Sequence, residues 1–277
     1  MITKKANLAK VLSNVYLTKK EPLSVVHFIT NRCNARCSFC FIDFDDPKTF
    51  KGELSLEEIE KLTKSYGNSL LNVNFTGGEP FARKDIIEIA KLYIQNTTIQ
   101  SIFITTNGSL PDRVESFVKE ITKFNEDIEI GIQISIDDFP EKHNKVRKIP
   151  DLFKSCLDTY FRVKSFGSNI TSSASITVTQ ENCKNIENIF NYMFYDCKID
   201  SIKGILVRDE GVYKTPEKER KKIFEAYTWL VDKITEFTEK GLMKNHNKDS
   251  LQGKLHNAKD KISYGLVKKM YLEPHYI

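Results

Sequence analysis

Three cysteines in the segment CNARCSFCF are the residues of this sequence best suited to chemistry. Cys33, Cys37 and Cys40 have the spacing Cys-x₃-Cys-x₂-Cys. Thiolates are soft ligands that favour zinc and iron–sulfur clusters. A closed structural zinc site takes four ligands, usually as two pairs, and no second pair lies nearby. The spacing leaves two alternatives, a distant fourth protein ligand or a metal centre with one open position.

Flexible and polar residues follow three other apolar segments of the chain. They are Gly77-Gly78-Glu79-Pro80 after segment 71–75, Asn107-Gly108 after 101–106, and Ser135, Asp137, His143, Asn144 and Arg147 at and after 128–136. In parallel sheets, ligands bind at the carboxyl ends of the strands. We therefore expect one rim of a sheet to gather thiolates, glycines, a carboxylate and a cation.

The elements that must position these residues alternate between strand and helix. The predicted strands are 23–29, 71–75, 101–106, 128–136, 170–179 and 201–207. The predicted helices are 55–66, 84–95, 111–124, 151–166 and 182–195, the first with a capping box of Ser55 and Glu58. Repeated βα units imply a parallel sheet with right-handed crossovers. We predict an α/β fold, a partial (β/α)6 barrel that is open and TIM-like, with a helical C-terminal extension.

The alternation stops after Val207. Residues 215–241 predict one long amphipathic packing helix, with Thr215 as N-cap, Pro216 at the first helical position and Gly241 as C-cap. Residues 242–277 predict helix and then irregular structure. We expect an N-terminal arm (1–22), a core domain (23–210) and a helical C-terminal extension (211–277).

Composition restricts the class of protein. The chain has 277 residues and a net charge of +5, with lysines spread along its length, which gives no reason to expect a nucleic-acid partner. The N-terminus does not resemble a signal peptide, and no segment is long and apolar enough for a membrane span. We therefore expect a cytoplasmic protein without a membrane partner, in which clustered cysteines serve metal binding or catalysis.

The cysteine spacing, with Phe39 before the last cysteine, resembles the signature of the radical S-adenosylmethionine (radical SAM) superfamily. TGGEP at 76–80, TTNG at 105–108 and SIDDFPEKHNKVRK at 135–148 are similar to later blocks of that family. The resemblance covers residues 23 to about 210. It implies a radical SAM enzyme in which Cys33, Cys37 and Cys40 hold a 4Fe-4S cluster. The cluster's free iron would bind S-adenosylmethionine and cleave it reductively to a 5′-deoxyadenosyl radical, which abstracts hydrogen from a substrate.

The resemblance also implies roles for the rim residues. Gly77 and Gly78 would let the backbone approach the methionine end of the cofactor, and Glu79 would accept hydrogen bonds from its α-ammonium group. Ser135 would contact the ribose, and Arg147 would pair with the cofactor carboxylate. Phe39 would pack beside the cluster, with its backbone near the adenine.

Two rim positions have less specific assignments. Asp137 would contact the ribose or cap the following loop, and where the family usually has Asp-Gly this chain has Asp137-Asp138. Asn107 would lie in a cofactor loop or form an ordinary turn.

Other residues fit ordinary structural roles. His143 fits a solvated loop residue, and Arg147 fits a surface charge as well as a cofactor contact. Cys156, Cys183 and Cys197 form no metal-like pair and fit core or helix-end positions.

The order of blocks, with the segment ILVRDEG at 205–211, resembles the SPASM subgroup, which carries a C-terminal auxiliary-cluster extension. Its cysteines would follow a segment resembling EPHYI, and we expect that extension to be absent here. The resemblance suggests a peptide or cofactor precursor as substrate, and a reductant such as flavodoxin or ferredoxin. Two alternatives stay open: a non-catalytic structural-zinc or electron-carrying iron–sulfur protein, and a truncated inactive core.

Overall fold

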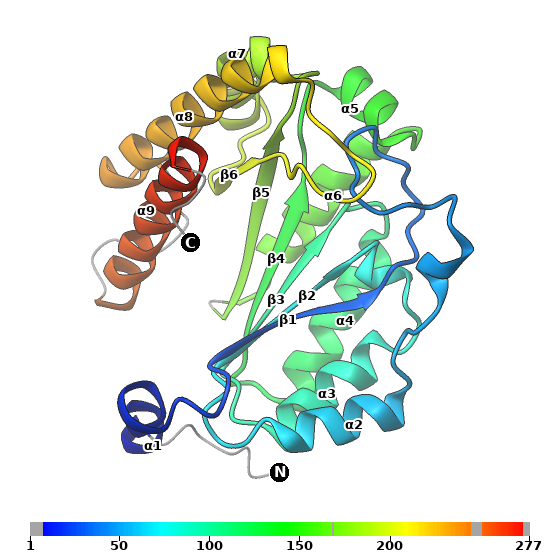
Figure 1. The fold of residues 1–277 in the computed structure, drawn as a ribbon, viewed down its shortest axis with the longest axis vertical. Helices are drawn as coiled ribbons and strands as arrows, with labels where there is room; N and C mark the ends of the chain where they lie inside the picture. The colour runs from blue at the N-terminus through cyan, green and yellow to red at the C-terminus, as the bar shows by residue number, and fades with distance from the viewer. Residues whose placement is uncertain (1–7, 168, 245–250, 274–277) are drawn as a thin grey trace.

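The computed structural model describes residues 8–167, 169–244 and 251–273 (Figure 1). Its strands are β1 (Ser24–Thr30), β2 (Asn72–Gly77), β3 (Ser101–Thr106), β4 (Glu129–Ser135), β5 (Ile170–Val178) and β6 (Ile202–Leu206). Its α-helices are α1 (Leu8–Ser13), α2 (Leu56–Ser65), α3 (Ile86–Asn96), α4 (Pro111–Phe124), α5 (Pro140–Arg147), α6 (Leu152–Lys164), α7 (Ile186–Asn191), α8 (Glu217–Glu239) and α9 (Leu251–Leu272).

The strands form one parallel sheet in the order β1-β2-β3-β4-β5-β6. Each crossover leads to the next neighbour with the same hand, so the connecting helices α2, α3, α4 and α6 all cover one face of the sheet (Figure 1). The sheet curves around its other face without closing. The predicted open, partial (β/α)6 barrel is therefore confirmed.

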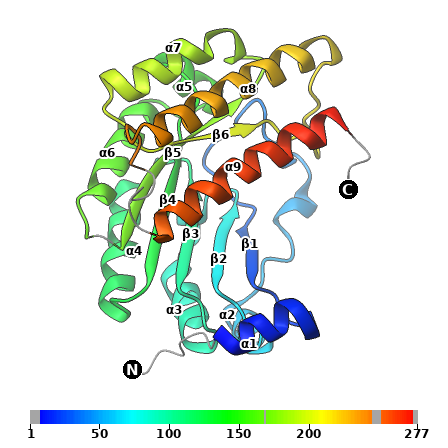
Figure 2. The same cartoon turned by 90° about the vertical axis from the view of Figure 1, so that its left-hand side faces the viewer.

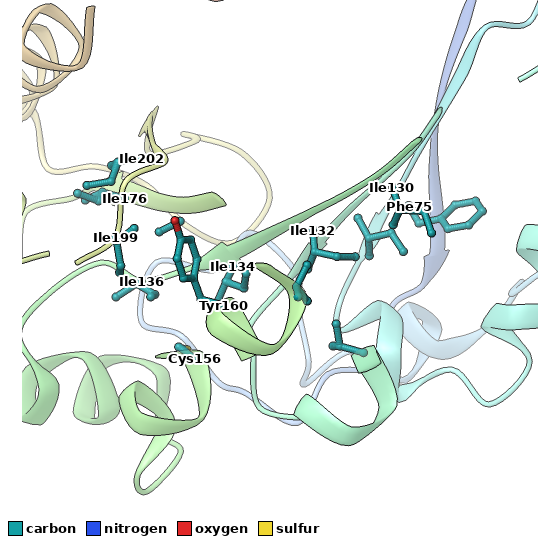
Figure 3. Close-up of a cluster of buried hydrophobic side chains, with 14 of the residues drawn as sticks. Phe75, Ile130, Ile132, Ile134, Ile136, Cys156, Tyr160, Ile176, Ile199 and Ile202 are labelled. Atoms are coloured by element: carbon teal, nitrogen blue, oxygen red, sulfur yellow. The ribbon is translucent and has the colours of Figure 1, made fainter. Parts of the chain in front are cut away.

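The hydrophobic core lies between the sheet and its outer helices. Ile130, Ile132 and Ile134 alternate along β4 and point to this side, where they are almost completely buried. Figure 3 shows these isoleucines with Cys156 and Tyr160 of α6. This packing fixes the register of the strands, because a shift of one residue would turn the isoleucines to the opposite face.

The inner face of the sheet differs from the apolar outer face in carrying many polar side chains. It lines a cavity of about 340 Å³ with the amide and hydroxyl side chains of Asn72, Asn74, Thr105, Gln133, Thr171 and Ser173 from β2 to β5, together with the apolar residues Phe103, Ile104 and Ile205. The interior of a closed TIM barrel is instead filled by branched apolar side chains. We call this cavity the inner chamber. Helix α9 lies across its open side (Figure 2).

Most predicted elements agree with the structure in place and type, and the differences concern helices. The capping box of Ser55 and Glu58 is confirmed at α2. Helices α1 and α5 are additional helices. The predicted helix 182–195 is divided into a 3₁₀ turn (Cys183–Asn185), α7 and a π-helical turn (Tyr192–Asp196). Helix α8 begins at Glu217, so Pro216 rather than Thr215 is the N-cap residue, because the Thr215 backbone N–H donates to Asp209 (2.6 Å) outside the helix. Lys240 is the C-cap, and Gly241 follows it with φ of 71°.

No helix within the described ranges is both long and apolar enough to cross a membrane.

Candidate active site

A second cavity, of about 190 Å³, lies at the carboxyl ends of the strands. We call it the rim cavity. Its lining includes most of the site residues predicted from the sequence: Cys33, Cys37, Phe39, Cys40, Gly77, Gly78, Asn107, Ser135 and Arg147. Glu79 and Asp137 do not line it, and both are buried directly behind lining residues. The fold thus brings together residues that are more than 100 positions apart in the chain.

The cysteine loop is held by the C-terminal end of α5. The backbone N–H of Arg36 donates to the carbonyl of Arg147 (3.1 Å), and that of Ser38 donates to the carbonyl of Val146 (3.2 Å). The guanidinium of Arg36 also donates to the carbonyl of Cys33 (2.7 Å). The first two bonds satisfy carbonyl groups that the end of a helix leaves free, and they fix the loop beside Arg147.

The three thiols share one partly buried environment. Burial raises the pKa of all three, and that of Cys37 reaches about 11. The positive charge of Arg147 opposes this rise at Cys37 and Cys40. Metal ligation requires thiolates, so a cationic centre would have to supply the remaining stabilisation.

The donor set fits an iron–sulfur cluster. Within the part of the chain that the structure describes, no three His, Cys, Asp or Glu side chains are close enough together to hold one metal ion. The three cysteines nevertheless line the same cavity. Three soft sulfur ligands that line one cavity suit an iron–sulfur cluster.

The glycine turn packs against the chain that leaves β1. Gly77 has φ of 131°, and a Cβ there would lie 2.0 Å from the carbonyl oxygen of Thr30. A Cβ on Gly78 would lie 2.2 Å from the carbonyl oxygen of Arg32. The backbone N–H groups of Gly78 and Glu79 donate to these same two carbonyls, at 2.7 and 2.8 Å. The glycines therefore allow the turn to dock on the start of the cysteine loop.

Glu79 connects the glycine turn to the loop after β3. Its carboxylate is fully buried and accepts hydrogen bonds from the Phe81 N–H (3.0 Å), the Thr106 hydroxyl (2.7 Å) and the Asn107 N–H (2.7 Å). Burial raises the pKa of Glu79, and these three donors oppose the rise. The predicted bond to the cofactor's ammonium group remains a prediction, and the structure adds this positioning role.

Asn107 connects the same loop to the cysteine segment. Its side-chain amide donates to Asn34 (2.8 Å), its side-chain oxygen accepts from the Ser109 N–H (2.9 Å), and its carbonyl accepts from the Cys156 thiol (3.1 Å). The loop is thus both a tight turn and a wall of the rim cavity.

Arg147 and Asp137 form a buried ion pair. Both Nε and Nη2 of Arg147 lie 2.7 Å from one carboxylate oxygen of Asp137, and the other oxygen accepts from the Thr177 N–H (3.0 Å). The Arg147 guanidinium lies 5.6 Å from the centre of the Phe39 ring. Arg147 is 6 % exposed, so the alternative of a surface charge is wrong.

His143 is fully buried, so its prediction as a solvated loop residue is also wrong. It lies on α5, and its Nδ1 accepts from the Asp137 N–H (3.2 Å). Burial lowers the pKa of His143 to about 4. The sequence showed no helical pattern at α5, which is why the inward position of this side chain was missed.

Several lining residues were not identified from the sequence: Phe41, Phe44, Thr76, Thr105, Thr177, Ile205 and Arg208. Thr76, Thr105 and Thr177 stand at or near the carboxyl ends of predicted strands, and this position was the available signal. Arg208 lies 5.6 Å from the centre of the Phe41 ring.

The other three cysteines lie apart from the cavity lining. Cys156 is buried in the core under Asn107, Cys183 is buried in a short helical turn, and Cys197 caps a helical segment. Their prediction as core and helix-end residues is confirmed.

An open parallel half-barrel with a cysteine-lined cavity at its carboxyl rim defines a cofactor-binding α/β enzyme. The family model described as Radical SAM superfamily matches residues 28–193, and the chain belongs to this superfamily. It is therefore a radical SAM enzyme, from a family that uses a 4Fe-4S cluster and S-adenosylmethionine.

Curated relatives match part of the chain. GTP 3′,8-cyclase of Pasteurella multocida is 37% identical over 111 residues, which are 39% of this chain and 31% of the relative. Fe-coproporphyrin III synthase of Methanosarcina barkeri is 30% identical over 178 residues, which are 63% of this chain and 41% of the relative. The aligned segments thus span less than half of these relatives.

Solved structures share the fold. The structure of native anSMEcpe with bound AdoMet and the Kp18Cys peptide is 22% identical, with a TM-score of 0.59, over 80% of this chain and 62% of that one. Streptococcus suis SuiB bound to precursor peptide SuiA is 17% identical, with a TM-score of 0.57, over 82% of this chain and 50% of that one. At these identities the likeness establishes the fold alone.

Proposed function

We propose that Cys33, Cys37 and Cys40 hold the 4Fe-4S cluster of this enzyme and that the rim cavity binds S-adenosylmethionine beside it. When bound, this pair supplies reductive cleavage of S-adenosylmethionine and hydrogen abstraction from a substrate. The observation that carries the proposal is the shared cavity: three thiols, the glycine turn, Asn107 and Arg147 line one space at the carboxyl rim.

The remaining site residues would bind and orient the cofactor. Gly77 and Gly78 present backbone at the cavity wall, and Ser135 presents a hydroxyl to the same space. Arg147 presents a cation to a carboxylate, and the bond to Asp137 holds its guanidinium in one orientation. Because both oxygens of Asp137 accept bonds from protein groups, this carboxylate supports the site from behind Arg147.

The substrate is proposed to be a peptide or a cofactor precursor. Peptides are bound in the anSMEcpe and SuiB structures, and the names of the curated relatives refer to GTP and a porphyrin. A flavodoxin or ferredoxin would supply the electron. We also propose that residues 23–210 form the core domain, between an N-terminal arm (1–22) and a helical extension (211–277).

Anaerobic reconstitution tests the proposed function. The full chain, reconstituted with iron and sulfide, reduced with dithionite and given S-adenosylmethionine, should produce 5′-deoxyadenosine. Replacing Cys33, Cys37 and Cys40 with alanine should abolish both cluster absorbance and product. Cys183→Ala is the matched control, because Cys183 lies outside the cavity and should leave both unchanged.

A contrary result would favour the alternatives. A protein that binds zinc in place of iron and yields no 5′-deoxyadenosine would support a structural metal site. A protein that forms the cluster but cannot cleave S-adenosylmethionine would support an electron carrier or an inactive core.

A further inference from the structure

The inner chamber has few charged groups, and they are concentrated at one place. Among the described residues that line it, full charges belong to Lys203 on β6 and to Lys259 and Asp260 on α9. The remaining polar lining consists of amides and hydroxyls. A chamber with this lining favours a ligand that is rich in hydrogen-bonding groups and carries negative charge at the Lys203 end.

Lys203 is paired with Asp260 across the open side of the chamber. Its ammonium contacts the Asp260 carboxylate, with the two side chains 20% and 31% exposed. The two charges therefore lie on different elements, Lys203 on the sheet and Asp260 on the helix that covers it. An anion entering the chamber would compete with Asp260 for the Lys203 ammonium.

The chamber adjoins the proposed cofactor site. Thr105 and Ile205 line both the inner chamber and the rim cavity. Lys203 lies two residues before Ile205 on the same face of β6, a spacing of about 7 Å along a strand. A ligand anchored at Lys203 would thus extend towards the proposed site of radical formation.

We propose that Lys203 recognises an anionic group of the substrate, and that α9 covers the chamber with Asp260 in the place of that group. This inference rests on the proposed function and, of its two substrate classes, favours the cofactor precursor: a small polar organic anion, bearing a carboxylate or a phosphate. A chamber of about 340 Å³ suits a ligand of this size. Displacement of Asp260 by the substrate would loosen α9 when the chamber is filled.

Anion binding to the reconstituted full chain tests this assignment. The probes are succinate and inorganic phosphate, each compared with sodium chloride at matched ionic strength, so that carboxylate and phosphate recognition are separated. Binding is read from thermal-unfolding shifts, and movement of α9 from its hydrogen exchange. We expect at least one probe to bind the wild-type protein and to increase exchange in α9.

Substitutions at positions 203 and 260 test whether Lys203 is the residue that binds the probe. Lys203→Gln should weaken the probe at least ten-fold, and Lys203→Arg should restore it. Asp260→Asn should strengthen it about two- to five-fold, because it removes the competing partner of a half-buried ion pair. Lys268→Gln is the matched control, since Lys268 pairs with Asp232 (2.5 Å), and neither residue lines the chamber.

Several results would overturn the inference. The first is that Lys203→Gln binds the probe as tightly as the wild type does. The second is that Asp260→Asn binds the probe more weakly than the wild type. The third is that hydrogen exchange in α9 is unchanged when the probe is bound. If Lys203→Gln fails to fold, Lys203→Arg and Asp260→Asn still test the assignment. Production of 5′-deoxyadenosine is measured in the same samples. Cleavage of S-adenosylmethionine without Lys203-dependent binding of a probe would refute this inference alone. Probe binding without cleavage would refute the proposed function alone.

Discussion

At the scale of single residues, the site depends on close backbone contacts and one buried charge pair. The glycine turn docks on the cysteine loop because Gly77 and Gly78 have no Cβ. Arg147 keeps its charge inside the protein because Asp137 lies against it. Both features can be tested by single substitutions.

Gly78→Ala should displace the cysteine loop. Its new Cβ would lie 2.2 Å from the backbone oxygen of Arg32, a group that cannot move aside as a flexible side chain can. We expect a loss of about 1–3 kcal/mol in the free energy of unfolding and a reduced iron content after reconstitution. Urea unfolding and iron analysis measure the two effects.

Gly167→Ala is the control, because nothing lies within 4 Å of its added Cβ. Equal iron contents in the two variants would show that the contact with Arg32 does not position the loop.

Asp137→Asn should strongly destabilise the protein. The substitution removes the countercharge of a buried guanidinium, which typically costs about 3–5 kcal/mol in the free energy of unfolding. The control is Asp158→Asn, because Asp158 is half-exposed in its pair with Arg162 and should contribute less than about 1 kcal/mol. Similar urea midpoints for the two variants would contradict this interpretation of the Arg147 pair.

At the scale of elements, α9 differs from the helices that cover the outer face of the sheet. It lies over a polar chamber rather than an apolar sheet face, and it packs on α8 through Tyr271, whose ring stacks on Phe224 at 3.8 Å. The side of α9 that faces the protein therefore makes both an aromatic packing contact and a charged contact. This combination suits a helix that can move away from the chamber.

Gly265→Ala should stabilise α9. Gly265 lies in the interior of the helix, and nothing lies within 4 Å of an added Cβ. The alanine should slow hydrogen exchange in α9 and favour the helix by about 0.5–1 kcal/mol.

Gly241→Ala should instead lower the free energy of unfolding, because Gly241 follows α8 with φ of 71°, where alanine is strained. Faster hydrogen exchange in α9 of Gly265→Ala than in α9 of the wild type would contradict the expected stabilisation of the helix.

At the scale of the whole molecule, half-buried His27 and fully buried His143 make stability depend on pH. Burial lowers the pKa of His27 and that of His143 to about 4, with the charge of Arg83 adding to the effect at His27. An unfolded histidine titrates near 6.5, so the unfolded chain binds more protons between pH 6.5 and 4.

The free energy of unfolding should therefore fall as the pH drops through this range. The slope should approach about 1.4 kcal/mol per pH unit for each histidine. Urea unfolding of the wild type and His27→Gln at pH 7.5, 6 and 5 measures this slope, and the variant should show a smaller one. Equal slopes would mean that His27 binds protons equally in the folded and unfolded states, so that folding does not lower its pKa.

Much of the fold and part of the site were accessible from the sequence. The alternation of β-rich and amphipathic segments predicted six parallel strands, because the two periods are local properties of the chain. The spacing of Cys33, Cys37 and Cys40 identified the candidate cluster ligands, because residues so close in sequence stay close in space in any fold. The carboxyl-end rule then predicted the rim, where the structure places the glycine turn and Asn107.

Other features were decided only by the tertiary structure. The burial of His143, the pairing of Arg147 with Asp137, and the contact of Lys203 with Asp260 depend on which elements pack together. Lys203 and Asp260 are 57 positions apart, and no local pattern relates them. A sequence determines the period and chemistry of its segments locally, whereas the partner and dielectric surroundings of a charge exist only after distant segments have packed.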